Sequence, residues 1–236
     1  MRVSYSRVQD RPGGDLRPLR YGAARRCVNA AFALALWLSA GAAAADPLRV
    51  LAFGDSLTAG YGLTAADGFP ARLEAALAAA GVAARVIDGG VSGDTTAGGL
   101  ARLDWALAED PDVVIVELGG NDGLRGLDPA ATEANLDAIL ARLGAEGRAV
   151  LLTGMRAPPN LGPEYGAAFD GVFPALAERH GVAFYPFFLD GVAADPTLNQ
   201  PDGIHPNAAG VALVVERLLP HLLRAIERAA ADGPPG

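Results

Sequence analysis

Five short apolar runs, separated by longer segments with helical spacing, constrain the fold of this chain more than any other feature. The runs are rich in branched residues and carry almost no charge, as expected for strands that are covered on both faces of a parallel sheet. They lie at residues 48–53, 84–87, 113–118, 149–153 and 182–185. Because parallel neighbours are joined by right-handed crossovers through helices, the pattern predicts a three-layer α/β sandwich.

The segments between these runs carry the signals of helices. In the first segment Pro70 lies near the start and Gly81 at the stop, and the second has leucines at 100, 103 and 107. The third begins with a cap at Asp128-Pro129, the fourth, at 164–179, contains Pro174, and the last runs from Pro206 to about Ala231. A proline inside a helix removes a hydrogen bond, so we expect the segment at 164–179 to be kinked or split. For the five parallel strands we expect the flavodoxin-like order 2-1-3-4-5, with helices on both faces.

The first 45 residues differ in composition from the rest of the chain. Seven arginines lie between Arg2 and Arg26, and an uncharged, alanine-rich run then reaches an A-x-A pattern at residues 43–45. We therefore expect a secretory signal peptide over residues 1–45, a single domain over 46–236, and a periplasmic or secreted protein. The apolar run is close to the length of a membrane span, so an uncleaved anchor remains the alternative.

Charge and cysteine content narrow the classes of partner and chemistry. Beyond residue 45 the chain has 12 arginines against 25 carboxylates, a net charge of −13, which argues against a nucleic-acid partner. Cys27 precedes the expected cleavage point, so the mature chain would have no disulfide, no catalytic thiol and no thiolate metal site. We expect a monomer without cofactor or metal, and without stable membrane insertion once the leader is removed.

Polar clusters come after four of the five predicted strands. Ser56 comes after the first, and further clusters occupy residues 88–96, 119–122 and 202–205. In open parallel sheets, ligands bind outside the carboxyl ends of the strands, so these clusters are expected to converge on one rim. Convergence of four segments favours a catalytic site over ordinary turn chemistry.

A serine and a histidine within these clusters suit nucleophilic catalysis. Serine needs a base to accept its proton, and of the three histidines only His205 lies in a loop after a strand, whereas His180 and His221 fall at or within helices. Asp202 precedes His205 by three residues and could hold the imidazole Nδ1. The alternative is that Asp202 or His205 merely satisfies free amides at a helix start.

Acyl transfer also needs hydrogen-bond donors for a developing oxyanion. Glycines at 89, 90, 93, 119 and 120 free the backbone to approach a ligand, and Asn121 can offer its side-chain NH₂. Taken alone, each fragment is typical of a turn, and GGND is a turn more often than a site. We expect Asp55 and Asp94 to hold their own loops by hydrogen bonds to backbone amides.

Four blocks of the sequence resemble, in order, those of the SGNH (GDSL) hydrolases, and especially the bacterial periplasmic esterases with thioesterase, arylesterase and lysophospholipase activity. The blocks are GDSL at 54–57, Gly93 within SGDT, Asn121 within GGND and His205 within DGIHP. The resemblance implies Ser56 as nucleophile, His205 as general base and then acid, and Asp202 as its orienting partner. It implies an oxyanion hole made of the Ser56 and Gly93 N–H groups and the Asn121 side chain, in a shallow, mobile site.

We therefore expect two-step hydrolysis of short to medium acyl esters, including aryl esters, thioesters and lysophospholipids, through an acyl-Ser56 intermediate. Leu124, Leu127 and Leu161 would line an acyl groove or pack as ordinary loop residues. The proline-rich segment 155–162 departs from the resemblance, and 186–202 is either a lid or a packed loop. A carbohydrate O-deacetylase of the same fold and a non-enzymatic flavodoxin-like binding protein are the alternatives.

Overall fold

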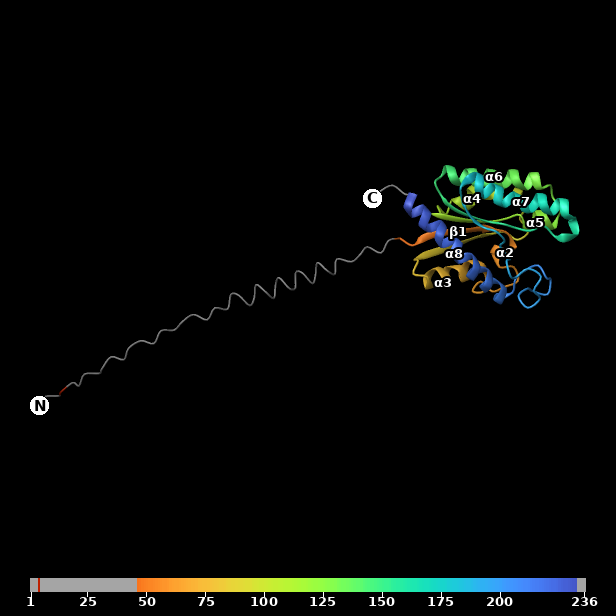
Figure 1. Cartoon of the computed structure of the whole chain (residues 1–236). Coiled ribbons are helices and arrows are strands. Elements are labelled where there is room, and N and C mark those ends of the chain that lie inside the picture. Colours follow the sequence, from red (N-terminus) through yellow and green to blue (C-terminus); the bar gives the residue numbers. More distant parts are fainter. Residues whose placement is uncertain (1–3, 5–45, 233–236) are drawn as a thin grey trace. The chain divides into compact units, whose positions relative to one another are not determined.

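The computed structural model describes Ser4 and residues 46–232, and residues 46–232 form a five-stranded, all-parallel sheet of order β2-β1-β3-β4-β5 (Figure 1). The strands are β1 (Leu48–Gly54), β2 (Ala84–Gly90), β3 (Val113–Glu117), β4 (Ala149–Thr153) and β5 (Ala183–Tyr185). The predicted fold class and strand order are confirmed. The predicted leader, residues 1–45, lies outside the described residues apart from Ser4 and stays a prediction.

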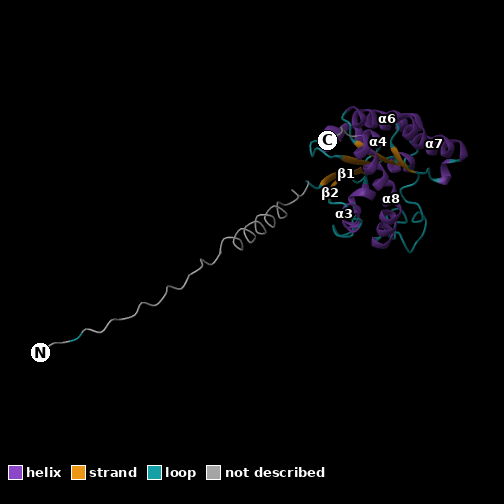
Figure 2. Cartoon of the chain, turned by 60° about the vertical axis from the view of Figure 1, so that its left-hand side comes forward, coloured by secondary structure: helices purple, strands orange, loops and turns teal. Residues whose placement is uncertain are grey.

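Helices cover both faces of the sheet. They are α2 (Ser56–Ala59), α3 (Phe69–Ala79), α4 (Thr96–Leu107), α5 (Gly120–Leu124), α6 (Pro129–Ala145), α7 (Pro163–His180), α8 (Ala208–Asp232) and a 3₁₀ turn, η1 (Pro159–Leu161). Figures 1 and 2 show α4, α6 and α7 on one face and α3 and α8 on the other. The arrangement is the three-layer sandwich predicted from alternating strands and helices.

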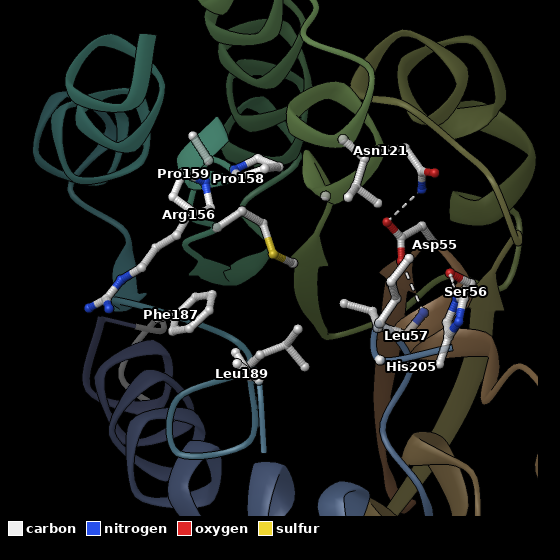
Figure 3. Close-up of a pocket in the computed structure, with 18 residues that line it drawn as sticks. Asp55, Ser56, Leu57, Asn121, Arg156, Pro158, Pro159, Phe187, Leu189 and His205 are labelled. Atoms are coloured by element: carbon white, nitrogen blue, oxygen red, sulfur yellow. Dashed lines mark hydrogen bonds between the residues drawn. The ribbon is translucent and has the colours of Figure 1, made fainter. Parts of the chain in front are cut away.

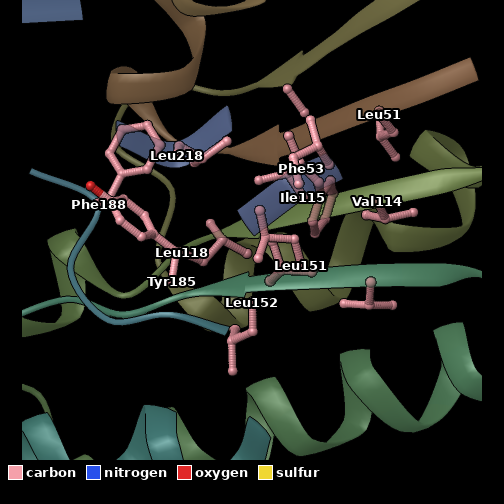
Figure 4. Close-up of a cluster of buried hydrophobic side chains, with 14 of the residues drawn as sticks. Leu51, Phe53, Val114, Ile115, Leu118, Leu151, Leu152, Tyr185, Phe188 and Leu218 are labelled. Carbon is pink, nitrogen blue, oxygen red and sulfur yellow. The ribbon is translucent and has the colours of Figure 1, made fainter. Parts of the chain in front are cut away.

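The core consists of branched and aromatic side chains from the central strands and the helices that face them. All five residues of β3 are buried, which explains why the sequence there is continuously apolar until its last position. Figure 4 shows Phe53, Ile115 and Leu151 of three neighbouring strands packed in one cluster with Phe188. The packed sheet thus supports the loops at its carboxyl edge.

The register of the three strands β2, β1 and β3 brings their carboxyl ends level. Gly54 pairs with Gly90 on one side and with Glu117 on the other. The segments after these residues therefore leave the sheet at the same edge, as the clustering of polar residues predicted.

Four details differ from the sequence prediction. The last helix begins at Ala208 rather than Pro206, because Asn207 caps it through Oδ1, which accepts from the N–H groups of Ala209 and Gly210. The helix that contains Pro174 is not split. β2 continues to Gly90 through residues that resemble a turn, and the short helices α2 and α5 have too few residues to show helical periodicity.

A helix that crosses a membrane must be long and apolar, and the helices of this structure can be compared with that requirement. Within the described part of the chain, no helix combines the length and apolar character that a membrane span requires.

Candidate active site

Ser56 lies on a tight turn between β1 and α2. β1 ends at Gly54, where an added Cβ would collide with the carboxylate of Glu117, so the turn requires glycine there. Asp55 then caps α2, because its Oδ1 accepts a hydrogen bond of 3.0 Å from the Leu57 N–H. The turn places the Ser56 hydroxyl at the carboxyl edge of the sheet.

His205 reaches the same edge from a short hairpin near the other end of the chain. Asn199 and Pro206 form an isolated antiparallel bridge, and the Gln200 N–H donates to the His205 carbonyl oxygen at 2.8 Å. Gly203 closes the hairpin with a φ of 71°, in the left-handed region that favours glycine. This turn directs the imidazole toward the serine.

Three predicted residues form one chain of hydrogen bonds. His205 Nδ1 lies 2.7 Å from Asp202 Oδ2, and His205 Nε2 lies 2.9 Å from Ser56 Oγ, although serine and histidine are 149 positions apart. An ionised carboxylate can only accept, so Nδ1 carries the hydrogen and Nε2 is the free acceptor that faces the serine hydroxyl. The arrangement suits removal of the serine proton.

Asp202 is held as an anion by its own loop. Its Oδ1 accepts from the N–H groups of Ile204 and His205 at 2.9 and 3.0 Å. These backbone hydrogen bonds, and after them the contact with the imidazole, lower the pKa of Asp202 to about 2. Asp202 therefore remains charged at any pH at which a histidine can act as a base.

Two residues that the sequence did not indicate support His205. The ring of Tyr61 lies 4.6 Å from the imidazole, centroid to centroid. Gln200 Nε2 donates to the carbonyl oxygens of Tyr61 at 2.6 Å and Pro206 at 3.0 Å. Gln200 thus ties the loop after α2 to the histidine hairpin. No local pattern could have predicted a contact between residues 139 positions apart.

The two further predicted oxyanion donors lie on neighbouring loops. Asn121, in α5, lines the same pocket as Ser56, and its Nδ2 donates to Asp55 Oδ2 at 2.9 Å. Gly93 has a φ of 87°, and its carbonyl oxygen accepts from Arg125 Nη2 at 2.8 Å, which fixes the peptide. Gly93 is not among the residues that line the pocket.

A pair of buried carboxyl groups lies beneath the serine turn. Glu117 Oε2 accepts from the Asp55 N–H at 3.2 Å and from the Thr58 hydroxyl at 2.7 Å. Burial, and after it the charge of Asp55, raises the pKa of Glu117 well above its usual range. Burial also raises the pKa of Asp55 to about 6, against the lowering effect of its hydrogen bonds to Leu57 and Asn121. At neutral pH the charge therefore resides on Asp55.

The candidate site opens into a pocket of about 660 Å³. Figure 3 shows Ser56 and His205 on one side of it, and Arg156, Phe187 and Leu189 across from them. The lining is mostly apolar, and the Arg156 guanidinium lies 4.7 Å from the centre of the Phe187 ring. Such a pocket suits a hydrocarbon chain rather than a sugar.

Of the three leucines expected either to line an acyl groove or to pack as loop residues, one lies at the pocket. Leu124 lines the pocket, whereas Leu127 and Leu161 do not. Pro158 and Pro159 of the proline-rich segment also line it, so this segment does shape the pocket (Figure 3).

Other polar residues singled out in the sequence have structural partners. His180 Nε2 lies 2.8 Å from Asp137 Oδ1, and His221 Nδ1 lies 2.9 Å from the carbonyl oxygen of Phe184. Neither histidine lines the pocket.

Asp55 holds its own loop as predicted, but Asp94 does not do so through a backbone amide. Its carboxylate instead pairs with Arg102 at 2.5 Å, and Arg102 also donates to the carbonyl oxygen of Gly54 at 2.8 Å. Trp105 is exposed on α4 and does not line the pocket, so it offers no aromatic platform for a sugar there.

A metal-binding site would need a cluster of ligand side chains. Within residues 46–232, no group of three or more His, Cys, Asp or Glu side chains is arranged to hold an ion.

Comparison with models of known protein families shows which family the chain belongs to. Residues 52–213 match the model of the GDSL-like lipase/acylhydrolase family. The chain belongs to this family. The match extends from β1 into α8 and so includes Ser56, Asn121 and His205.

Three relatives are similar to this GDSL-family chain over most of their length. Esterase TesA of Pseudomonas aeruginosa is 46% identical over 190 residues, which are 80% of this chain and 94% of that protein. An arylesterase of Vibrio mimicus is 39% identical, over 79% of this chain and 93% of that protein. Thioesterase 1/protease 1/lysophospholipase L1 of Escherichia coli is 44% identical, over 70% and 78%. A crystal structure of TesA matches with a TM-score of 0.72 and 45% identity, over 75% of this chain and 99% of that one.

Proposed function

We propose that this GDSL-family protein hydrolyses carboxylic esters of short to medium acyl chains through an acyl-Ser56 intermediate. The observation that supports it best is the continuous contact from Asp202 through His205 to Ser56 beside a mostly apolar pocket. The relatives are an esterase, an arylesterase and a thioesterase/lysophospholipase, which supports aryl esters, thioesters and lysophospholipids as substrates.

The proposed reaction has two steps. His205 Nε2 accepts the proton of Ser56 as Oγ attacks the substrate carbonyl, and the same nitrogen then gives that proton to the leaving alcohol or thiol. Water repeats the cycle on the acyl-serine and releases the acid. Asp202 stabilises the imidazolium that forms in each half, and the N–H groups of Ser56 and Gly93 and the amide of Asn121 stabilise the oxyanion.

The export of the protein is also a proposal. The arginine-rich start, the uncharged run and the A-x-A pattern support a cleaved leader over residues 1–45 and a periplasmic or secreted domain over 46–236. We propose that this domain acts as a monomer, because Ser56, His205 and the pocket all come from one chain.

A screen of acyl length tests the proposed activity. The purified protein would be assayed with p-nitrophenyl esters and matched thioesters from acetate to palmitate. We expect hydrolysis across the series, because the pocket beside Ser56 is mostly apolar, with kcat/KM highest for the short to medium chains proposed above. Absence of hydrolysis across the whole series would contradict the proposal, and highest activity on palmitate would contradict the chain-length assignment.

The role of Asn121 gives a second test. Asn121→Ala is expected to lower kcat about 10²- to 10³-fold with KM nearly unchanged, which is the effect of losing one oxyanion donor. Steady-state kinetics on a p-nitrophenyl ester would measure it. Asn135→Ala, which removes an amide that donates to Thr96 Oγ1 away from the pocket, is the matched control. An effect of Asn121→Ala confined to KM would assign it to binding instead.

A further inference from the structure

Asp55 is almost fully buried, at 1% exposure, yet it bears the charge of the carboxyl pair at neutral pH. Its two oxygens have separate partners: Oδ1 accepts from the Leu57 N–H, and Oδ2 accepts from Asn121 Nδ2 (Figure 3). The first contact caps a helix, which a serine would do without burying a charge. The second contact therefore needs its own explanation.

An amide side chain can present either oxygen or nitrogen to a neighbour. A carboxylate oxygen only accepts, so Asp55 Oδ2 requires that the nitrogen of Asn121 face it. The nitrogen has two hydrogens, and the bond to Asp55 uses one of them. The other is left to donate to the carbonyl oxygen of a substrate at Ser56. If the amide turned over, its oxygen would instead face the developing negative charge and repel it.

We infer that Asp55 is a positioning residue that holds the Asn121 amide in the orientation required to stabilise the oxyanion. This inference rests on the proposed function, and it assigns to Asp55 a role beyond that of its own loop. Asp55 does not contact the reacting atoms in this account and acts through Asn121.

The surroundings of Asp55 keep it in place and set its charge. Glu117 Oε2 accepts from the Asp55 N–H, which anchors the main chain from below. Burial and the charge of Asp94 oppose ionisation of Asp55, whereas the donors on Leu57 and Asn121, and after them His205, favour it. Because Glu117 is the more deeply buried and has the strongly raised pKa, it holds the proton of the pair.

Ionised Asp55 lowers the stability of the fold. Its pKa rises from 3.8 to about 6, chiefly through burial, so the folded state binds this proton more tightly than the unfolded state does. Protonated Asp55 therefore contributes stability that is fully present below about pH 4 and is lost as the pH rises through about 6. Replacing Asp55 with an uncharged residue should therefore affect the melting temperature more favourably at pH 8, where Asp55 is ionised, than at pH 4. The same replacement is expected to slow the enzyme.

Two substitutions separate the role of the cap from that of the amide. In Asp55→Ser, the hydroxyl can still cap α2 but is too short to reach Asn121. In Asp55→Asn, the shape is kept, but one of the two donors, Leu57 N–H or Asn121 Nδ2, must now face an NH₂ group. We expect kcat to fall about 10- to 100-fold in Asp55→Ser and at least as much in Asp55→Asn, with KM within about threefold.

A double-mutant cycle with Asn121→Ala tests the coupling. If Asp55 acts through Asn121, then adding Asp55→Ser to Asn121→Ala should lower kcat no more than about twofold further. Losses that multiply in the double variant would overturn the inference. Full kcat in Asn121→Ala alone would overturn the proposed oxyanion role as well, so the two failures are distinguishable. If Asp55→Asn does not fold, Asp55→Ser carries the same cycle.

Discussion

Replacing Ser56 with alanine is expected to lower kcat/KM for p-nitrophenyl esters by about 10⁴- to 10⁶-fold. The Ser56 hydroxyl lies 2.9 Å from the base nitrogen of His205, and alanine removes the oxygen that this nitrogen would activate. Folding should be unaffected, because Asp55 caps α2 and alanine is favourable inside a helix. Thermal unfolding measured beside the kinetics would separate lost chemistry from lost structure.

Ser92 provides the matched control for this substitution. It is an exposed serine of the neighbouring loop and does not line the pocket. Ser92→Ala should keep kcat/KM within about twofold, as expected of a surface substitution. If Ser56→Ala retained more than a small fraction of the activity, another nucleophile would have to be sought.

Replacing Asp202 with asparagine should lower kcat by about 10²- to 10⁴-fold, the range expected when the partner of a catalytic histidine loses its charge. Oδ1 accepts from two backbone N–H groups, so the amide oxygen of an asparagine would take that place. Its NH₂ would then face His205 Nδ1. This forces Nδ1 to accept, puts the hydrogen on Nε2, and leaves no acceptor for the serine proton.

The low pKa of Asp202 adds a feature to this prediction. Because the carboxylate is ionised down to about pH 2, the loss in Asp202→Asn should persist across the whole range from about pH 5 to pH 9. Asp195→Asn is the control, since Asp195 holds the N–H and hydroxyl of Thr197 in the same loop region without contact to His205. A loss in Asp202→Asn of less than about tenfold would contradict the assigned role.

Much of the fold could be predicted because the strands are buried on both faces. The continuous apolar run that ends at Glu117 fits only a buried strand. The helix at 129–145 is marked in the sequence by its N-terminal cap, Asp128. Edges and short elements could not be predicted in this way. β2 lies at an edge of the sheet and ends in Asp88-Gly89-Gly90, so no branched apolar side chain marks its last residues.

The catalytic candidates could be predicted for a local reason and a global one. Asp202 and His205 are three residues apart, so a single turn joins them, and the loops that leave parallel strands at their carboxyl ends gather along one edge of the sheet. The contacts of Asp55 with Asn121 and of Asp55 with Glu117 join residues 66 and 62 positions apart. Glu117 did leave a signal, a lone acid at the end of a buried strand, but its partner could not be deduced without the register.

The separation of Ser56 from His205 also governs when activity can first arise during biosynthesis. The serine turn belongs to the first strand, whereas the imidazole is supplied by the segment immediately before the final helix. A ribosome-bound polypeptide thus carries an unactivated hydroxyl until nearly the whole chain has emerged and collapsed. Ester cleavage consequently reports completed folding of the intact polypeptide, and fragments lacking roughly the last 35 residues should be inert.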